Sequence, residues 1–185
     1  MPTPARTSLD EIIDAGRSLI ESAGLDGLTM QSIAERVGVK APSLYKRVES
    51  RAHLIKLVAE DVVADLTATL DASIRGEDAR EDAVALARAF RRFAQRNPGA
   101  YGLIFSTLPD EIRPGAEHLA AASQSVLRTA SFLSGPENAL EAARTLTAWA
   151  HGFVTLELSG GFRLGGDVDK AFDFGVNRLA KALSR

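Results

Sequence analysis

The sequence predicts an all-α protein of about nine helices, in which a three-helix N-terminal domain of residues 1–50 precedes a larger helical domain of residues 51–185. Apolar residues recur at helical spacing along nearly the whole chain, and the strict alternation typical of strands is absent. Capping residues and glycine or proline breakers divide this pattern into segments. With 185 residues, 45% hydrophobic and 25% charged, the chain has the composition of an ordinary soluble protein with a buried core.

The first helix is predicted to run from Ser8 to Gly24. Ser8 and Glu11 have the spacing of a capping box, and an apolar stripe follows them. Gly24 stands where a left-handed residue would end the helix. Residues 25–28 are therefore predicted to form a short loop.

Two short helices are predicted after this loop. Thr29 is placed to cap the first of them and Gly38 to end it. Pro42 suits the first turn of the second, which is expected to end at about Arg47. Two short helices joined by a tight turn that contains glycine describe a helix-turn-helix, whose second helix enters the major groove of DNA.

The second short helix has side chains suited to this task. Its first residues are small, so that the backbone can approach base edges closely: Ala41, Pro42 and Ser43. Thr29, Tyr45 and Lys46 can donate hydrogen bonds to flanking phosphates.

The charge of the chain is unevenly distributed. Six basic residues and one acidic residue lie between Arg36 and Lys56, a local charge of +5 in a chain whose net charge is −2. Such a basic patch in an acidic chain is typical of phosphate binding. A solvated charged surface would give the same count.

A long helix is expected from Arg51 to Ile74, where apolar residues recur every fourth position. It would be about 35 Å long and could link two modules. The helix expected at 137–158 is apolar on two faces and is predicted to be buried nearly all round. The other expected helices cover residues 82–96, 117–133 and 167–183, with a short aromatic segment at 101–105.

The stretch LTMQSIAERVGVKAPSLYKRVESRAHLI, from Leu28 to Ile55, resembles the N-terminal signature of the TetR family of transcriptional regulators. The resemblance implies that residues 40–46 form the recognition helix and that Arg51 contacts a phosphate. It also implies that three residues of the preceding helix and its cap face DNA: Thr29, Gln31 and Ser32. A regulator of this kind, usually a repressor, binds a double-stranded DNA operator and loses affinity when a small organic effector occupies its C-terminal domain.

Two departures from the family pattern concern packing and charge. Arg47-Val48 stands where the family usually has His-Phe, and Arg51 stands where it usually has Lys. Val48 is smaller but still apolar, and both arginines keep or add positive charge. Downstream, Trp149-Ala-His151-Gly152 followed by Leu156-Glu157-Leu158 is similar to the Trp-His-Gly type of TetR C-terminal domain.

An apolar effector site is predicted in the C-terminal region, because ligand sites are mostly apolar with few polar groups. His151 would be the polar contact, unless it is a structural histidine bonded to a neighbouring carbonyl. Glu157 is expected to reach solvent at the end of its helix. The aromatic candidates, which could equally be plain core, are Phe90, Phe93, Tyr101, Phe105, Trp149 and Phe153.

The last two helices carry more apolar surface than one subunit of this size needs to cover. They are predicted to pair with their symmetry mates in a four-helix interface of a homodimer that reads an inverted repeat. The alternative is that the apolar residues of both helices are buried inside one subunit. The residues assigned to the interface are Leu140, Ala143, Val154, Phe172, Val176, Leu179 and Leu183.

The sequence gives little support for other classes of protein. The chain has no cysteine, and its three histidines lack the spacing of metal ligands, so neither a metal nor a cofactor is predicted. No export signal or membrane span is expected, which fits a cytoplasmic protein. No catalytic motif is present. An all-helical enzyme or carrier for an anionic substrate, and an architectural DNA-binding module without a ligand, remain the alternatives.

Overall fold

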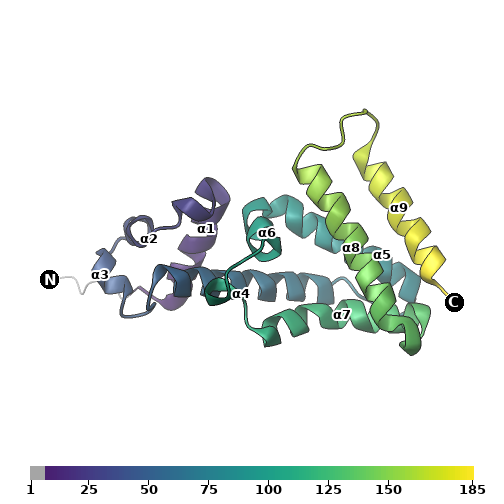
Figure 1. Cartoon of the computed structure of the whole chain (residues 1–185), viewed down its shortest axis with the longest axis horizontal. Coiled ribbons are helices and arrows are strands. Elements are labelled where there is room, and N and C mark those ends of the chain that lie inside the picture. The colour runs from purple at the N-terminus through teal and green to yellow at the C-terminus, as the bar shows by residue number, and fades with distance from the viewer. Residues whose placement is uncertain (1–6) are drawn as a thin grey trace. The chain divides into compact units, whose positions relative to one another are not determined.

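The computed structural model describes residues 7–185, and over these residues the protein is all-α, as predicted (Figure 1). Two short 3₁₀ turns, Asp110–Ile112 and Pro136–Asn138, accompany the helices. None of the helices in this part of the chain is long and apolar enough to cross a membrane. The nine α-helices of the described residues are α1 (Leu9–Gly27), α2 (Met30–Val37), α3 (Ala41–Leu44), α4 (Arg51–Asp71), α5 (Ala79–Arg96), α6 (Pro98–Phe105), α7 (Ala116–Ser134), α8 (Ala139–Leu158) and α9 (Val168–Leu183).

Contacts divide the chain into two compact units. The first runs up to Ala64 and also contains Asn97–Leu119, and the second contains Asp65–Arg96 and Ala120–Arg185. Helix α6 therefore packs with the N-terminal helices, although it directly follows α5 of the second unit in the chain. The functional division after residue 50 stays a prediction.

Local signals account for the starts of α1 and α2. The Ser8 hydroxyl accepts the N–H of Glu11, and the Glu11 carboxylate accepts that of Ser8, which confirms the capping box. Thr29 caps α2 in the same reciprocal way with Ser32. Gly38 ends α2 with φ at 73°, a left-handed conformation that side-chain-bearing residues rarely adopt.

The end of α1 differs from the prediction. Gly24 breaks the regular helix with φ at 68°, but one further helical turn continues to Gly27. The predicted loop at 25–28 is therefore mostly helical, because the N–H of Leu28 still bonds to the Leu25 carbonyl.

The boundary between α4 and α5 also differs. Helix α4 ends at Asp71 rather than Ile74, and α5 begins three residues before the expected Asp82. The start of α5 is capped by Asp78, and the Asp82 carboxylate binds the loop that precedes the helix. The Asp78 carboxylate accepts the N–H groups of Arg80 and Glu81, whereas Asp82 accepts those of the preceding loop, at residues 75 and 76.

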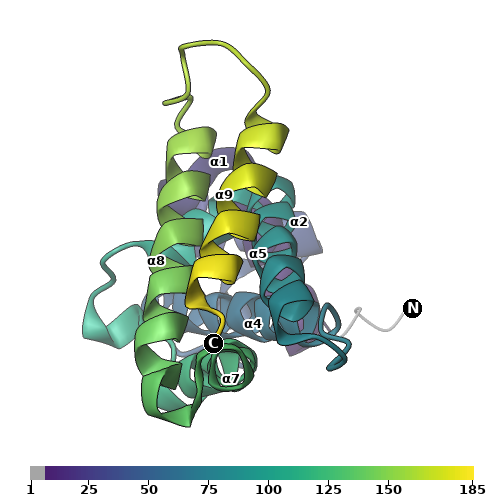
Figure 2. The same cartoon turned by 90° about the vertical axis from the view of Figure 1, so that its right-hand side faces the viewer.

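In the second unit, α5, α8 and α9 pack against one another, with α8 and α9 side by side (Figure 2). Their shared core includes the side chains of Val84, Leu133, Leu146, Phe172 and Val176. The expectation that the helix at 137–158 is buried nearly all round is wrong within one subunit. Its neighbours cover only one side of α8, so Leu140 and Leu156 are 45% and 51% exposed.

Candidate nucleic-acid interface

Helix α3 presents an exposed surface from a buried anchor. Leu44 and the following Val48 are almost fully buried, so they fix this single turn of helix to the core. Tyr45 is 54% exposed. The other exposed members of the predicted recognition segment are Lys40, Pro42, Ser43 and Lys46, while Ala41 is half-buried.

The predicted DNA-facing residues of α2 have local bonds as well. The Ser32 hydroxyl lies 2.8 Å from the Gly27 carbonyl oxygen and accepts the N–H of Thr29 at 2.9 Å. Ser32 therefore helps to cap the start of α2, from the N3 position where the capping-box motif has Glu or Gln. Gln31 is exposed, and its amide donates to Glu35 one turn later at 2.7 Å.

Arg51 has a structural role that sequence reasoning missed. Its Nε donates to the Leu28 carbonyl at 2.5 Å and its Nη2 to the Leu25 carbonyl at 2.7 Å. The guanidinium thereby binds α4 to the last turn of α1, whose carbonyls need donors from outside the helix. Arginine has five N–H donors, so these two bonds do not use all of them, and the phosphate contact of Arg51 stays a prediction.

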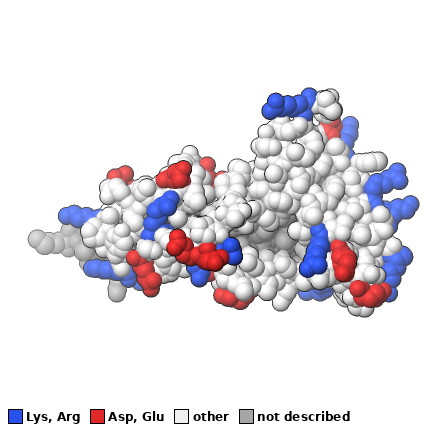
Figure 3. Space-filling model, viewed as in Figure 1, with Lys and Arg blue, Asp and Glu red and all other residues white. Residues whose placement is uncertain are grey.

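Positive and negative side chains are interspersed around this surface. Over the part of Figure 3 where α2 and α3 lie, Lys and Arg side chains are visible beside Asp and Glu. Arg36 donates to the Ser18 hydroxyl, and Lys56 Nζ lies 3.9 Å from Glu60 Oε1. The exposed cations within the recognition segment or directly after it are Lys40, Lys46 and Arg47.

The predicted ligand residues are distributed over both units. Tyr101 and Phe105 belong to the first unit, where their rings lie 4.8 Å apart. In the second unit, Phe90 and Phe93 are buried on α5. The ring of Trp149 lies 5.7 Å from that of Phe153, and both pack against Phe172 in the core described above.

His151 is separated from the aromatic side of α8. Two residues after Trp149, it lies roughly 200° further round the helix axis, and it is half-buried. A polar hollow of about 600 Å³ lies at the start of α5, and its lining includes Arg75, Arg80 and Arg88 but no predicted ligand residue. Its charged lining does not match the apolar site predicted from sequence.

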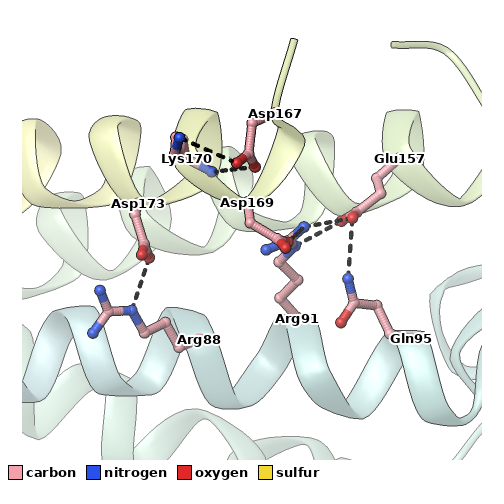
Figure 4. Close-up of polar contacts among 8 residues, drawn as sticks. All are labelled: Arg88, Arg91, Gln95, Glu157, Asp167, Asp169, Lys170 and Asp173. Carbon is pink, nitrogen blue, oxygen red and sulfur yellow. Dashed lines mark hydrogen bonds and ion pairs between the residues drawn. The ribbon is translucent and has the colours of Figure 1, made fainter. Parts of the chain in front are cut away.

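A charged network joins α5, α8 and α9 (Figure 4). Arg91, only 8% exposed, donates from Nε and Nη2 to the two Glu157 carboxylate oxygens at 2.7 and 2.5 Å. Its Nη2 also donates to Asp169 at 2.7 Å, and Gln95 donates to Glu157 at 3.0 Å. The Arg91 guanidinium lies 4.8 Å from the centre of the Phe172 ring, a cation–π contact.

This network corrects the expectation that Glu157 reaches solvent. The hydrogen bonds from Arg91 hold the pKa of the Glu157 carboxyl below its ordinary value of 4.5, against the opposing effect of burial. The same hydrogen bonds raise the pKa of Arg91. Arg91 lies on the apolar face of the helix predicted at 82–96. Since a buried arginine is rarely unpaired, its position in the sequence could have indicated an acidic partner in the core.

The residues predicted to form the subunit interface are mostly inside the subunit. Val154, Phe172 and Val176 have no exposed surface, and Ala143 is also buried. Phe172 and Val176 pack in the core that α9 shares with α5 and α8, and Ala143 packs against Ala130 of α7. Assigning them to a contact with a second subunit was wrong. Leu179 and Leu183 are partly buried against the same core, and Leu140 is the one predicted interface residue that is exposed.

Comparison with known proteins gives matches over both halves of the chain. Residues 83–179 match the model of the tetracyclin repressor-like C-terminal domain, and residues 12–58 match that of bacterial regulatory proteins of the tetR family. The uncharacterised HTH-type transcriptional regulator Rv0681 of Mycobacterium tuberculosis is 33% identical over 186 residues, which span 98% of this chain and 84% of that protein.

Solved structures show the same fold. A protein of unknown function from Rhodococcus sp. RHA1 has a TM-score of 0.83 at 24% identity, and all of both chains is covered. TetR-Q116A from Acinetobacter baumannii AYE, in complex with minocycline, has a TM-score of 0.68 at 24% identity, over 95% of this chain and 96% of that one. The narrower likeness to the Trp-His-Gly type stays a prediction.

Proposed function

The chain belongs to the TetR family of bacterial transcriptional regulators, and from this premise we propose that it is a repressor that binds a palindromic operator as a homodimer and is released by a small apolar ligand. The observation that carries the DNA-binding part is the exposed recognition segment of residues 40–46, which Leu44 anchors to the core. Of the predicted DNA-contacting residues, Ser32 and Arg51 are assigned a second, structural role.

Replacing both Tyr45 and Lys46 by alanine is expected to weaken binding to every duplex by about tenfold, since phosphate contacts do not depend on sequence. The slope of log affinity against log salt should fall by about 0.9 for each phosphate that the protein no longer neutralises. Fluorescence anisotropy at two salt concentrations, with a duplex selected from random fragments, measures both quantities. The control is Arg92→Ala, which removes an exposed cation from α5. Equal losses in the two variants would contradict the assignment.

The homodimer is proposed to form through the exposed sides of α8 and α9. The exposed side of α8 has small residues at its centre, among them Ala148, Gly152 and Thr155, and the exposed Leu140 and Leu156 flank them. A Cβ added at Gly152 would meet nothing within 4 Å, so packing within the subunit does not require this mid-helix glycine. The close approach of a second subunit to α8 would explain why a glycine stands at this position.

Two recognition helices held about 34 Å apart would then read an inverted repeat on successive major grooves. Sedimentation of the wild type at micromolar concentration tests this proposal. A monomer that still selects one DNA sequence would refute it.

The effector is proposed to be a small, largely apolar organic molecule that favours a conformation with lower DNA affinity. Phe105 supports this proposal, because it is 38% exposed and its ring lies beside that of Tyr101. A ligand selective for the folded state must stabilise it, so thermal shifts with a mixed library of apolar compounds test the idea. Compounds that shift the wild type are expected to lose their effect on Phe105→Glu. The same shifts in both proteins would exclude this residue from the site.

A further inference from the structure

Helix α6 lacks a cap of its own. Asn97, at its N-cap position, makes no side-chain hydrogen bond to the helix, and Pro98 in its first turn has no N–H. The first free donors of α6 are therefore the backbone N–H groups of Gly99 and Ala100, which need partners from elsewhere.

Those partners come from α1. The Glu21 carboxylate accepts the N–H of Gly99 through Oε2 at 2.9 Å and that of Ala100 through Oε1 at 2.8 Å. A carboxylate at this position also meets the positive end of the helix dipole. Glu21 thus caps a helix that begins 77 residues later in the sequence.

The two helices also touch through their backbones. A Cβ at position 99 would lie 2.7 Å from the Ile20 carbonyl oxygen and 3.0 Å from Glu21 Cα. Only glycine therefore allows the start of α6 to lie this close to α1. Ala100, Tyr101 and Leu103 are buried as α6 packs in the first unit.

Helix α6 has little intrinsic stability. It has eight residues, two of them glycines, whereas isolated helices shorter than about 12–15 residues are marginal even with good helix formers. Its helical state therefore depends on the contacts that α1 supplies. Only Asn97 separates α6 from α5 in the chain.

We propose that Glu21 is a positioning residue that couples the ordering of α6 to DNA binding by the N-terminal helices. This inference rests on the proposed DNA-binding function. Helix α2 packs on α1 and helix α3 packs on α2 in the same unit, so DNA that holds α3 and α2 also holds α1 and the Glu21 carboxylate in place. Coupling is reciprocal: if an ordered α6 favours DNA binding, bound DNA must stabilise α6 by the same factor.

Hydrogen exchange followed by mass spectrometry tests this coupling without an effector. The full-length protein is compared free and bound to the selected duplex, over the amides of residues 99–105. In the wild type, DNA is expected to slow their exchange by about tenfold. In Glu21→Ala the slowing should be less than about twofold at saturating DNA, and Glu21→Gln, which keeps one acceptor oxygen, should lie between them.

The matched control is Asp26→Ala, which removes the same charge from the end of α1. It should keep the full coupling. A merely structural role of Glu21 would speed exchange in the free protein and leave the DNA-induced factor unchanged, which would overturn the proposal. Equal loss of coupling in Asp26→Ala would also overturn it, since charge alone would then be the cause. If the wild type binds no DNA, the proposed function fails, whereas binding without slower exchange refutes only the coupling.

Discussion

Replacing Phe172 by alanine is expected to lower the free energy of unfolding by about 3–5 kcal/mol. The Phe172 ring has no exposed surface and lies 5.1 Å from the rings of both Trp149 and Phe153. Truncation leaves a cavity at the point where α5, α8 and α9 meet, and it also removes the cation–π contact with Arg91. Urea unfolding followed by circular dichroism measures the loss.

Phe174 provides the matched control, because it is on the same helix two residues later and is 65% exposed. Phe174→Ala is expected to change the free energy of unfolding by no more than about 0.5 kcal/mol at protein concentrations where the subunits are dissociated. At higher concentration it should weaken association, which sedimentation detects. A large loss of subunit stability from Phe174→Ala, with little from Phe172→Ala, would reverse the assignment of core and interface on α9.

Replacing Arg91 by methionine is expected to lower the free energy of unfolding at pH 7 by about 2–4 kcal/mol. Methionine fills much of the same apolar space but leaves the Glu157 and Asp169 carboxylates without their shared partner. Because Glu157 is only partly exposed, its uncompensated charge is costly. Urea unfolding at pH 7 measures this effect.

The pH dependence follows from the lowered pKa of Glu157. A carboxyl whose pKa is lower in the folded state than in the unfolded state stabilises the fold above the unfolded value. For Glu157 this contribution is complete above about pH 4.5 and is lost as the pH falls through the folded-state pKa. Arg91→Met should abolish this part of the acid sensitivity, so the two unfolding free energies should converge in acid.

The control for Arg91 is the neighbouring pair of Arg88 and Asp173, whose side chains lie 2.8 Å apart but are both nearly half exposed (Figure 4). Solvent screens such a pair, so Arg88→Met is expected to cost no more than about 1 kcal/mol. A loss in Arg88→Met equal to that in Arg91→Met would show that burial of the ion pair is not the cause.

The N-terminal helices were predictable because their signals are local. A capping box depends on residues three positions apart, and the left-handed Gly38 depends on its own backbone. Val48, which is smaller than the usual Phe but still apolar, is almost fully buried, as is Leu44. The end of α1 was less predictable, since a helical turn continued after the break at Gly24.

The candidate site was predicted less completely. Exposed residues of the recognition segment could be named from the helix-turn-helix pattern, but the carbonyl partners of Arg51 lie 23 and 26 residues earlier in the chain. No spacing rule connects residues so far apart. The same holds for Glu21, which caps a helix in a distant part of the sequence.

The sequence by itself determined the helix-turn-helix, the family and the helices other than α6, which it indicated only as an aromatic segment at 101–105, because each depends on residues close together in the chain. Tertiary structure alone decided which apolar side of α8 and α9 is used inside the subunit. Both helices have apolar residues on more than one side, and periodicity cannot say which side meets α5. Packing placed Phe172 in the core and left Phe174 exposed, and it turned Glu157 inward because Arg91 was there to neutralise it.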